Sequence, residues 1–468
     1  MKRTFIVALS ALLCVSLSAQ TKDRKDDKET ELNQYGQKVS TTTGQVKVQD
    51  GIMVLDAKKI DYKMWFDIRV QGDAAVFFGG PDFTSSELDG KDNPNHIGSG
   101  MSIRRARFAV KAQLDKNWYG EFDTDWSNGI VEIKDAVLAY TGIPGLEIKA
   151  GNFKENFSIQ RNTTSRYLMF MERPMVTSLA PSRHLGVNLT YSRDWLWASA
   201  GVFGPELKGA EEATAMQDNN KDFGRDEGLS YTGKLVFRPL RTKDALIHVG
   251  GAFSWREPKL TSTDTYGTAR YSTRNTTSIN RKKYLDTDEI TGLDHELLWT
   301  AELAGFYKGL RYEGAYIARG AVLDQNVNPL GTQWANGWYA QASYLLFGGR
   351  QNYDSDGAKP TRITPGRSWG DVELAFRYEY CNFNTNNYFG GSAEAYSVGL
   401  NFYPTKNVKF AVNYQFNNND RYANGKGKLY VGHDASGKPT KDYTKVVDEN
   451  GKAGVDYHML AVRFQVAF

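Results

Sequence analysis

Three basic side chains share one face of a short stretch of the sequence. In an extended chain, Arg105, Arg107 and Lys111 lie on one side, while Phe108 and Val110 lie on the other. Basic side chains that face water along a wall attract anions without holding them tightly, which is the chemistry of a selective pore. The spacing therefore predicts a column of positive charge along a path for anions.

Two further expectations concern the neighbours of this column. One alternative is that its cations only pair with carboxylates of the next stretch, Glu121, Asp123 and Asp125. Arg104 falls on the apolar face, so we expect it near a membrane interface, where its long stem can reach polar surroundings.

A second basic group lies in a long segment between residues 154 and 183. Its only acidic side chains are Glu155 and Glu172. The same segment contains an apolar cluster, Tyr167 to Met171, which is costly to expose to water. We therefore expect the segment to fold back against an inner wall and to narrow the path. Its basic side chains are Lys154, Arg161, Arg166, Arg173 and Arg183.

The elements that would position these side chains are β-strands. After residue 61, apolar and polar residues alternate in stretches separated by turn-rich Gly, Asn and Asp segments. In the last stretch, Leu460, Val462 and Phe464 share a face with the final residue, Phe468, while Arg463 lies on the other face. The predicted strands are 65–78, 101–113, 117–126, 130–141, 145–153, 184–192, 194–204, 228–239, 244–256, 295–306, 309–320, 334–347, 368–382, 394–404, 406–418 and 455–468.

The polar faces of these stretches carry successive charges, and aromatic residues such as Trp118 and Trp126 gather at their ends. This pattern predicts an all-β fold, a transmembrane antiparallel barrel of about 16 strands with a basic loop folded into its lumen. A charge on the lipid face at the bilayer centre would cost about 2 to 4 kcal/mol, so the basic face should turn inward. A barrel of this size leaves an aqueous channel.

Composition and the first residues point to export. With 24% charged residues and a mean hydropathy of −0.53, the chain is not a helical membrane protein. The apolar run from Phe5 to Leu17 is too short to span a bilayer and, after Lys2 and Arg3, predicts a signal peptide at 1–19. We expect a polar periplasmic segment at 20–61 and a barrel domain at 62–468 in the bacterial outer membrane.

The connections between the predicted strands are alternately short and long, and the short ones should face the periplasm. The connection 348–367 is long although it falls on the short side. Either a strand has been missed there or the segment folds into the lumen.

Enzyme chemistry finds little support in the sequence. The 6 histidines are scattered without metal-ligand spacing, and the single cysteine after the signal, Cys381, can form neither an internal disulfide nor a cysteine metal site. The calcium-like run 218–222 has Phe223 where glycine is needed. We expect no enzyme, cofactor or metal; a hydrolase with a Ser–His pair on the barrel rim is the remaining enzyme hypothesis. The net charge of +4 names no partner, and nucleic acid is not expected.

Several motifs resemble the phosphate-selective porin O and P family. They are Arg104-Arg105-Ala106-Arg107, Gly151-Asn152-Phe153-Lys154-Glu155-Asn156-Phe157, Phe170-Met171-Glu172-Arg173-Pro174, Leu179-Ala180-Pro181-Ser182-Arg183, Leu185-Gly186-Val187 and Gly399-Leu400-Asn401-Phe402-Tyr403-Pro404. The resemblance implies a sixteen-stranded, usually trimeric porin whose basic wall and third loop attract phosphate-like anions toward a narrow throat.

The resemblance and the strand pattern together give two sets of anion-path residues. The expected pore wall consists of Arg105, Arg107, Lys111, Lys149 and Arg463. The expected constriction loop contributes Lys154, Arg161, Arg166, Arg173 and Arg183. The resemblance supports an anion-path role most directly for Arg105, Arg107, Lys154 and Arg173.

The expected function is a passive outer-membrane porin for small anions such as phosphate or polyphosphate, with outer-membrane lipid and two further copies of the chain as partners. One alternative is a surface barrel acting as adhesin or scaffold, motivated by the long loops 204–227, 256–294 and 420–454. Another is a general porin without anion selectivity, because Asp135 and the carboxylates of 121–125 oppose a purely anionic channel.

Overall fold

The computed structural model describes residues 30–32, 37–40, 42–49, 52–80, 85–88, 90–127, 129, 131–204, 206–207, 225–226, 228–261, 264–385, 387–420, 428–447 and 454–468. The expected signal peptide lies outside these residues. The chain forms two compact units, residues 1–45 and 46–468. In the first, β1 (Thr30–Leu32) pairs antiparallel with β2 (Lys38–Ser40). Within the described ranges, no helix is long and apolar enough to cross a membrane.

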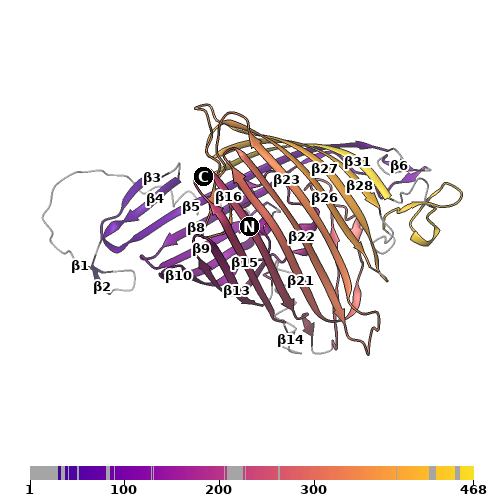
Figure 1. Ribbon diagram of the computed structural model, residues 1–468, viewed down its shortest axis with the longest axis horizontal. Coiled ribbons are helices and arrows are strands. Elements are labelled where there is room, and N and C mark those ends of the chain that lie inside the picture. Colours follow the sequence, from indigo (N-terminus) through magenta and orange to yellow (C-terminus); the bar gives the residue numbers. More distant parts are fainter. Residues whose placement is uncertain are drawn as a thin grey trace, which may run out of the picture. The chain divides into compact units, whose positions relative to one another are not determined.

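The second unit contains a closed antiparallel β-barrel (Figure 1). In the described part of the chain, 16 strands form the ring, and the last strand closes it by pairing with the first. In ring order they are β5 (Tyr62–Gly79), β8 (Gly100–Gln113), β9 (Trp118–Asp125), β10 (Glu132–Ile143), β11 (Leu146–Lys154), β12 (Arg183–Ser192), β13 (Leu196–Phe203), β15 (Ser230–Arg241), β16 (Ala245–Arg256), β21 (Ile290–Tyr307), β22 (Leu310–Leu323), β23 (Gln333–Leu345), β26 (Asp371–Asn384), β27 (Phe389–Tyr403), β28 (Val408–Asp420) and β31 (Gly454–Ala467). Each overlaps one predicted strand, so the predicted fold class is confirmed.

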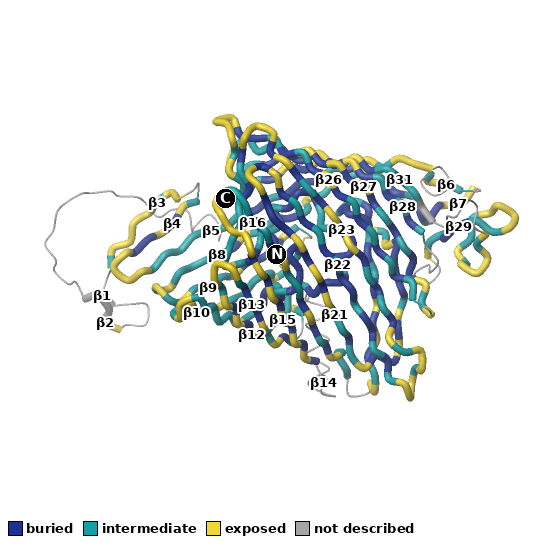
Figure 2. The backbone as a smooth tube through the Cα atoms, in the orientation of Figure 1, coloured by how far each residue is buried: buried dark blue, intermediate teal, exposed yellow. Residues whose placement is uncertain are grey.

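Alternation of side chains gives the wall two chemically different faces. Along β31, Val462 and Phe464 are each 46% exposed, whereas Arg463 between them is 4% exposed. Figure 2 shows the same alternation of buried and exposed residues along many neighbouring strands. Apolar side chains that face outward suit lipid, and the polar side chains face the lumen.

Part of the expected polar segment 20–61 is also sheet. A hairpin of β3 (Gln45–Gln49) and β4 (Ile52–Ala57) adds to the start of β5, where Val54 pairs with Trp65. Further along the same strand, β31 pairs with β5 from Ala467 onward. Because β5 extends beyond the end of β31, its backbone groups there need another partner, and β4 supplies it.

The long segment between β11 and β12, residues 155–182, lies inside the barrel; we call it the constriction segment. It contains α3 (Ile159–Asn162) and the short 3-10 helices η2 (Ser165–Tyr167) and η3 (Met175–Leu179). Inward side chains around the ring bond to it: those of Arg256, Glu302, Arg311, Arg377, Asn401, Lys409 and Arg463. The expected fold-back against the inner wall is therefore observed.

Apolar packing explains why this segment turns inward. Phe157, Met175 and Leu179 are at most 2% exposed and pack in one cluster with wall residues such as Leu298 and Ile317. The predicted apolar cluster of the segment is buried as well, with Met169 and Phe170 against Ala375. Burial of these side chains removes them from water and fills part of the lumen.

A second long connection, between β16 and β21, also turns inward. Tyr271 and Tyr284 are 3% and 1% exposed. Asn275 donates to Asn419 at 3.1 Å, and Thr276 donates to Gln415 at 2.7 Å. The described part of 256–294, one of the long loops that motivate the adhesin or scaffold alternative, therefore lies against the inner wall, where its polar and aromatic side chains find partners.

The connection 348–367 folds into the lumen, the second of the two alternatives. Its short hairpin of β24 (Tyr353–Asp354) and β25 (Lys359–Pro360) is held by Trp197, which donates to the carbonyl of Asp356 at 2.8 Å. Strands β23 and β26 pair directly with each other, so no barrel strand was missed there. We call residues 348–367 the inward hairpin.

Candidate functional site

A cavity of about 220 Å³ lies between the constriction segment and the wall formed by β5 and β8 to β11; we call it the path cavity. Seven basic and three acidic side chains line it, an excess of four positive charges. The basic residues are Arg69, Arg107, Lys111, Lys149, Lys154, Arg183 and Lys359. The acidic residues are Glu121, Asp123 and Asp135.

The structure brings half of the expected site residues to this cavity. Three come from the expected wall set, Arg107, Lys111 and Lys149, and two from the expected loop set, Lys154 and Arg183. They meet because β8 to β12, which include the strands of all five residues, follow one another in the ring and each directs alternate side chains inward. The other five expected residues lie elsewhere in the lumen.

Most cations of the path cavity have a carboxylate partner. Arg107 lies 3.0 Å from Asp125, and Lys111 lies 3.2 Å from Glu121. The alternative interpretation, pairing with the next strand, therefore applies to both of these residues. Arg183 is bound by Asp135 at 2.6 Å.

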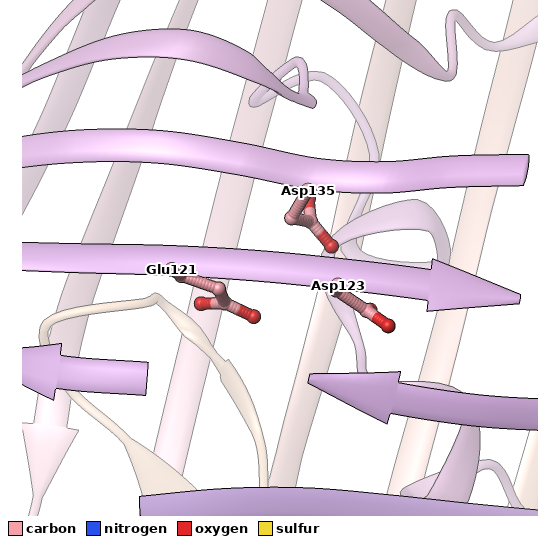
Figure 3. A group of neighbouring side chains, drawn as sticks. All are labelled: Glu121, Asp123 and Asp135. Atoms are coloured by element: carbon pink, nitrogen blue, oxygen red, sulfur yellow. The ribbon is translucent and has the colours of Figure 1, made fainter. Parts of the chain in front are cut away.

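The three acidic residues of the cavity form a compact group on β9 and β10 (Figure 3). One carboxylate oxygen from each of Glu121, Asp123 and Asp135 lies within 4.8 Å of the others. Such a group could attract a cation, but each member lies within 4.0 Å of a basic side chain. Glu121 pairs with Lys111, and Asp135 pairs with Arg183. Asp123 lies 3.6 Å from Arg107, which it shares with Asp125. The group therefore lowers the positive charge of the path without adding a free negative site.

Lys154 differs from the other lining cations. In the described part of the chain, its ammonium group has neither a carboxylate within 4.0 Å nor a hydrogen-bond partner. Its charged neighbours are Arg173, Arg183, Asp135 and Arg107, three positive groups and one negative group. Its charge is therefore the least compensated in the path cavity.

Arg161 and Arg173 lie close together behind the path cavity. Arg173 donates from Nε to the carbonyl of Gln160 at 2.5 Å and from its terminal nitrogen to that of Thr163 at 2.7 Å. It therefore caps the C-terminal end of α3, where free carbonyls favour a cation. Burial and the positive charge of Arg161 lower the pKa of Arg173 below its ordinary value.

A β-bulge in β8 reorients Arg104. The register passes from Gln71 paired with Arg105 to Gly72 paired with Ile103, which leaves Arg104 as the extra residue. Arg104 turns inward and donates to both carboxylate oxygens of Glu172, at 2.6 and 3.0 Å. The expectation that Arg104 snorkels at a membrane interface is therefore wrong, because simple alternation does not include the bulge.

Glu172 is the centre of a charged group that holds the constriction segment against the wall. We call this group, Glu172 with Arg104, Arg105 and Arg463, the latch. Arg463 donates to Glu172 at 3.0 Å and to Asp73 at 2.6 Å. Burial would raise the pKa of Glu172, but Arg104, Arg105 and Arg463 outweigh burial and hold that pKa well below its usual range. Two expected wall residues, Arg105 and Arg463, thus lie at the latch and not at the path cavity.

Two basic lining residues were not among the expected ones. Arg69 alternates with the outward Ile68 and Val70, so strand periodicity in 65–78 was a usable signal. Lys359 has no such signal, since the position of the inward hairpin depends on distant partners such as Trp197. Arg166, expected at the constriction, lines a second cavity instead.

Sixteen antiparallel strands closed around a basic path, with apolar residues facing outward, define an outer-membrane porin. The family model described as "Phosphate-selective porin O and P" matches residues 79–437. The chain belongs to that family.

Two curated relatives match over about two thirds of the chain. Porin O of Pseudomonas aeruginosa is 25% identical over an alignment of 360 residues that covers 69% of this chain and 78% of Porin O. An uncharacterized protein of Caulobacter vibrioides is 25% identical over 325 residues, which are 68% of this chain and 63% of that protein.

Solved structures include OmpT (in-vitro folded), an outer membrane protein of Vibrio cholerae. It aligns with a TM-score of 0.50 and 11% identity, covering 87% of this chain and 98% of OmpT. At that identity the likeness concerns the fold alone.

Proposed function

We propose that this porin passes small anions in preference to cations, with phosphate or polyphosphate as the physiological cargo. The observation that carries the proposal is the path cavity, where seven basic side chains face three acidic ones. Among the residues that the structure describes, Lys154 has no ion-pair partner there. Basic side chains lining a narrow aqueous path favour anions over cations.

The size of the path supports an electrostatic mechanism. At physiological ionic strength, charges act over about 8 Å before salt screens them. The side chains that line a cavity of about 220 Å³ surround an ion inside it, so their charges act on the ion together. Low-dielectric walls concentrate the field further. The basic excess among the lining side chains, in which the charge of Lys154 is the least compensated, then raises the local concentration of anions and lowers that of cations.

Phosphate is the finer part of the proposal. A phosphate oxyanion is recognised by several charged and neutral donors together. Lys154 and Arg183 supply cationic donors at the cavity, and Asn156, Asn162 and Thr164 of the constriction segment supply polar groups beside them. The description of the family as phosphate-selective supports the same cargo.

The state of the protein in the membrane is part of the same proposal. We propose a homotrimer in outer-membrane lipid, as the family resemblance implies, with residues 1–19 removed during export. Chemical cross-linking in native membranes would give a ladder ending at three copies. N-terminal sequencing of the extracted protein would begin at Gln20.

A general porin without anion selectivity is the second candidate. The acidic group Glu121, Asp123 and Asp135 favours it, because each carboxylate neutralises one lining cation. The reversal potential of the purified channel in a potassium chloride gradient separates the two candidates. A potential near zero after correction for ion mobility supports the general porin, and a potential near the chloride equilibrium value supports the anion channel.

A further inference from the structure

The hairpin of β3 and β4 lies beside the start of β5 and outside the closed ring of strands (Figure 1). It belongs to the segment 20–61, for which the sequence predicts a polar, periplasmic character. In the structure, the two faces of the hairpin differ in chemistry, and one of them is apolar. No residue of the hairpin lines the path cavity, so the anion path does not account for this apolar face.

The polar face of the hairpin continues the inner face of the barrel wall. Lys47 donates to Asp56 across the hairpin at 2.8 Å, so both side chains lie on the same face. Asp56 pairs in register with Lys63 of β5, and Lys63 pairs with Gln113 of β8. Alternation places Gln113 on the same face of β8 as Lys111, which lines the path cavity.

The opposite face of the hairpin is apolar and uncovered. Val46 and Val48 alternate with Lys47, and Met53 and Leu55 alternate with the buried face of β4. These four side chains are between 38% and 75% exposed. A contiguous apolar patch of this kind is costly in water and marks a surface that contacts lipid or protein.

The apolar face continues the outer face of the barrel wall. Leu55 pairs in register with Met64 of β5. Two positions further along β5, Phe66 stacks on Phe108 of β8, with ring centroids 5.6 Å apart. Outward side chains of a transmembrane barrel contact lipid. The hairpin therefore extends a surface that already faces lipid.

The register also places the hairpin near the edge of the membrane. At the end of β4, Ala57 pairs with Tyr62. The next strands continue this row, where the N–H of Leu114 donates to the carbonyl of Trp118 at 2.8 Å. The exposed ring of Trp118 packs on Tyr140, with ring centroids 4.9 Å apart. Outward aromatic rings gather at the membrane–water interface, so the hairpin lies close to that level.

The turn that follows the hairpin has the composition of a lipid-contacting segment. It contains η1 (Lys58–Ile60), in which both lysines and Ile60 are exposed, followed by Asp61. At a lipid surface, lysines reach the phosphates of the headgroups while apolar side chains enter the boundary of the acyl chains. Two lysines against one aspartate leave the turn with a positive excess that suits these phosphates.

We propose that the β3–β4 hairpin binds the phospholipid surface of the periplasmic leaflet. Its apolar face enters the boundary of headgroups and acyl chains to a depth of about 5 to 10 Å. The short-turn end of a bacterial barrel faces the periplasm, which assigns the leaflet. Lipid is the occupant, and not a second copy of the chain, because the apolar face is continuous with the lipid-facing wall. The inference goes beyond the proposed function and does not depend on anion preference.

The test measures contact between single fluorescent labels and lipid. Cysteines are introduced one at a time into the full-length protein, which is labelled and reconstituted into vesicles of phosphatidylethanolamine and phosphatidylglycerol. Lipids with a nitroxide near the headgroup should quench the label at Leu55→Cys or Val48→Cys about threefold more than at Gln49→Cys. Gln49 is the matched control, because it is exposed and adjacent to Val48 but lies on the polar face.

Two further positions calibrate the measurement. Val462→Cys on the lipid-facing wall should be quenched by nitroxides near the ends of the acyl chains. Ala435→Cys on the exposed turn 434–438 should be quenched by neither lipid. Cys381 is buried, so wild-type protein treated in the same way gives the background. Single-channel conductance of the hairpin variants should equal that of the wild type and shows that they are folded.

Each outcome decides between the possible surroundings of the hairpin. Quenching at residues 48 and 55 but not at residue 49 supports the lipid contact. Equally weak quenching at residues 48, 49, 55 and 435 places the hairpin in water and overturns it. Labels at residues 48 and 55 that neither nitroxide lipids nor aqueous iodide can reach would mean that protein covers the face, which also overturns it. A channel without anion preference, with both labels quenched, overturns the proposed function alone.

Discussion

Arg104 donates from its Nε atom to Oε1 of Glu172 at 2.6 Å, joining the wall strand β8 to the constriction segment. The contact exists because a bulge turns both Arg104 and Arg105 toward the lumen. Glu172 precedes Arg173, which caps α3, so the latch fixes the part of the segment that borders the path. In the proposed function, anion selectivity therefore depends on a residue that does not itself line the path cavity.

Replacing Glu172 should loosen the constriction segment. In Glu172→Gln, the latch arginines lose their shared carboxylate, and breaking a buried ion pair costs about 3 kcal/mol. We expect a lower unfolding temperature, measured by the heat-dependent gel shift of the folded barrel, and noisier single-channel currents. Glu147→Gln, which removes the partner of Lys149 at 2.8 Å, is the matched control and should change neither.

The latch should also resist acid. Because the pKa of Glu172 is depressed in the folded protein, its stabilising contribution is present above the ordinary glutamate pKa and disappears only as pH falls through the depressed value. The noise of wild-type single-channel currents should therefore not increase at about pH 4, where an ordinary glutamate is half protonated. Noise that appears in the wild type at about pH 4 would contradict a latch whose carboxylate has a depressed pKa.

Neutralising one carboxylate of the path should strengthen anion preference. In Glu121→Gln, Lys111 keeps Asp67 at 3.0 Å, and the cavity gains one unit of net positive charge. The anion-to-cation permeability ratio from reversal potentials should rise severalfold, since adding one unit charge to a narrow path shifts ion energies by about 1 kcal/mol. An unchanged ratio would mean that ions do not pass Glu121.

The inward hairpin should restrict the flow of ions. Replacing residues 353–360 with a short glycine-serine turn removes Lys359 and opens the short-turn end of the path cavity. Single-channel conductance should increase about twofold or more, because pore width limits passage. The same replacement at the exposed turn 434–438 should leave conductance unchanged, and equal conductance in both variants would exclude a restricting role.

The sequence predicts the barrel well because lipid and water impose strict alternation on every strand. Leu460, Val462 and Phe464 had to face one environment and Arg463 another, so strand positions followed from periodicity alone. Alternation fails where the backbone adds a residue, as at Arg104, whose direction depends on the bulge.

The candidate site was predictable only where it lies on strands. Arg107, Lys111 and Lys149 follow from alternation, and Arg69 could have been found in the same way. Lys359 could not, because its position depends on side chains far away in the sequence that hold the inward hairpin. Contacts of this kind leave no periodic signal.

Anion preference of the path is the central claim, and Lys154 is the residue on which it depends most. The direct measurement is the reversal potential of purified wild-type channels and of Lys154→Gln in a tenfold potassium chloride gradient. The wild type should reverse near the chloride equilibrium potential, and Lys154→Gln should shift toward zero, since the least compensated charge of the cavity is gone. A wild-type potential on the potassium side, unchanged in Lys154→Gln, would contradict the claim.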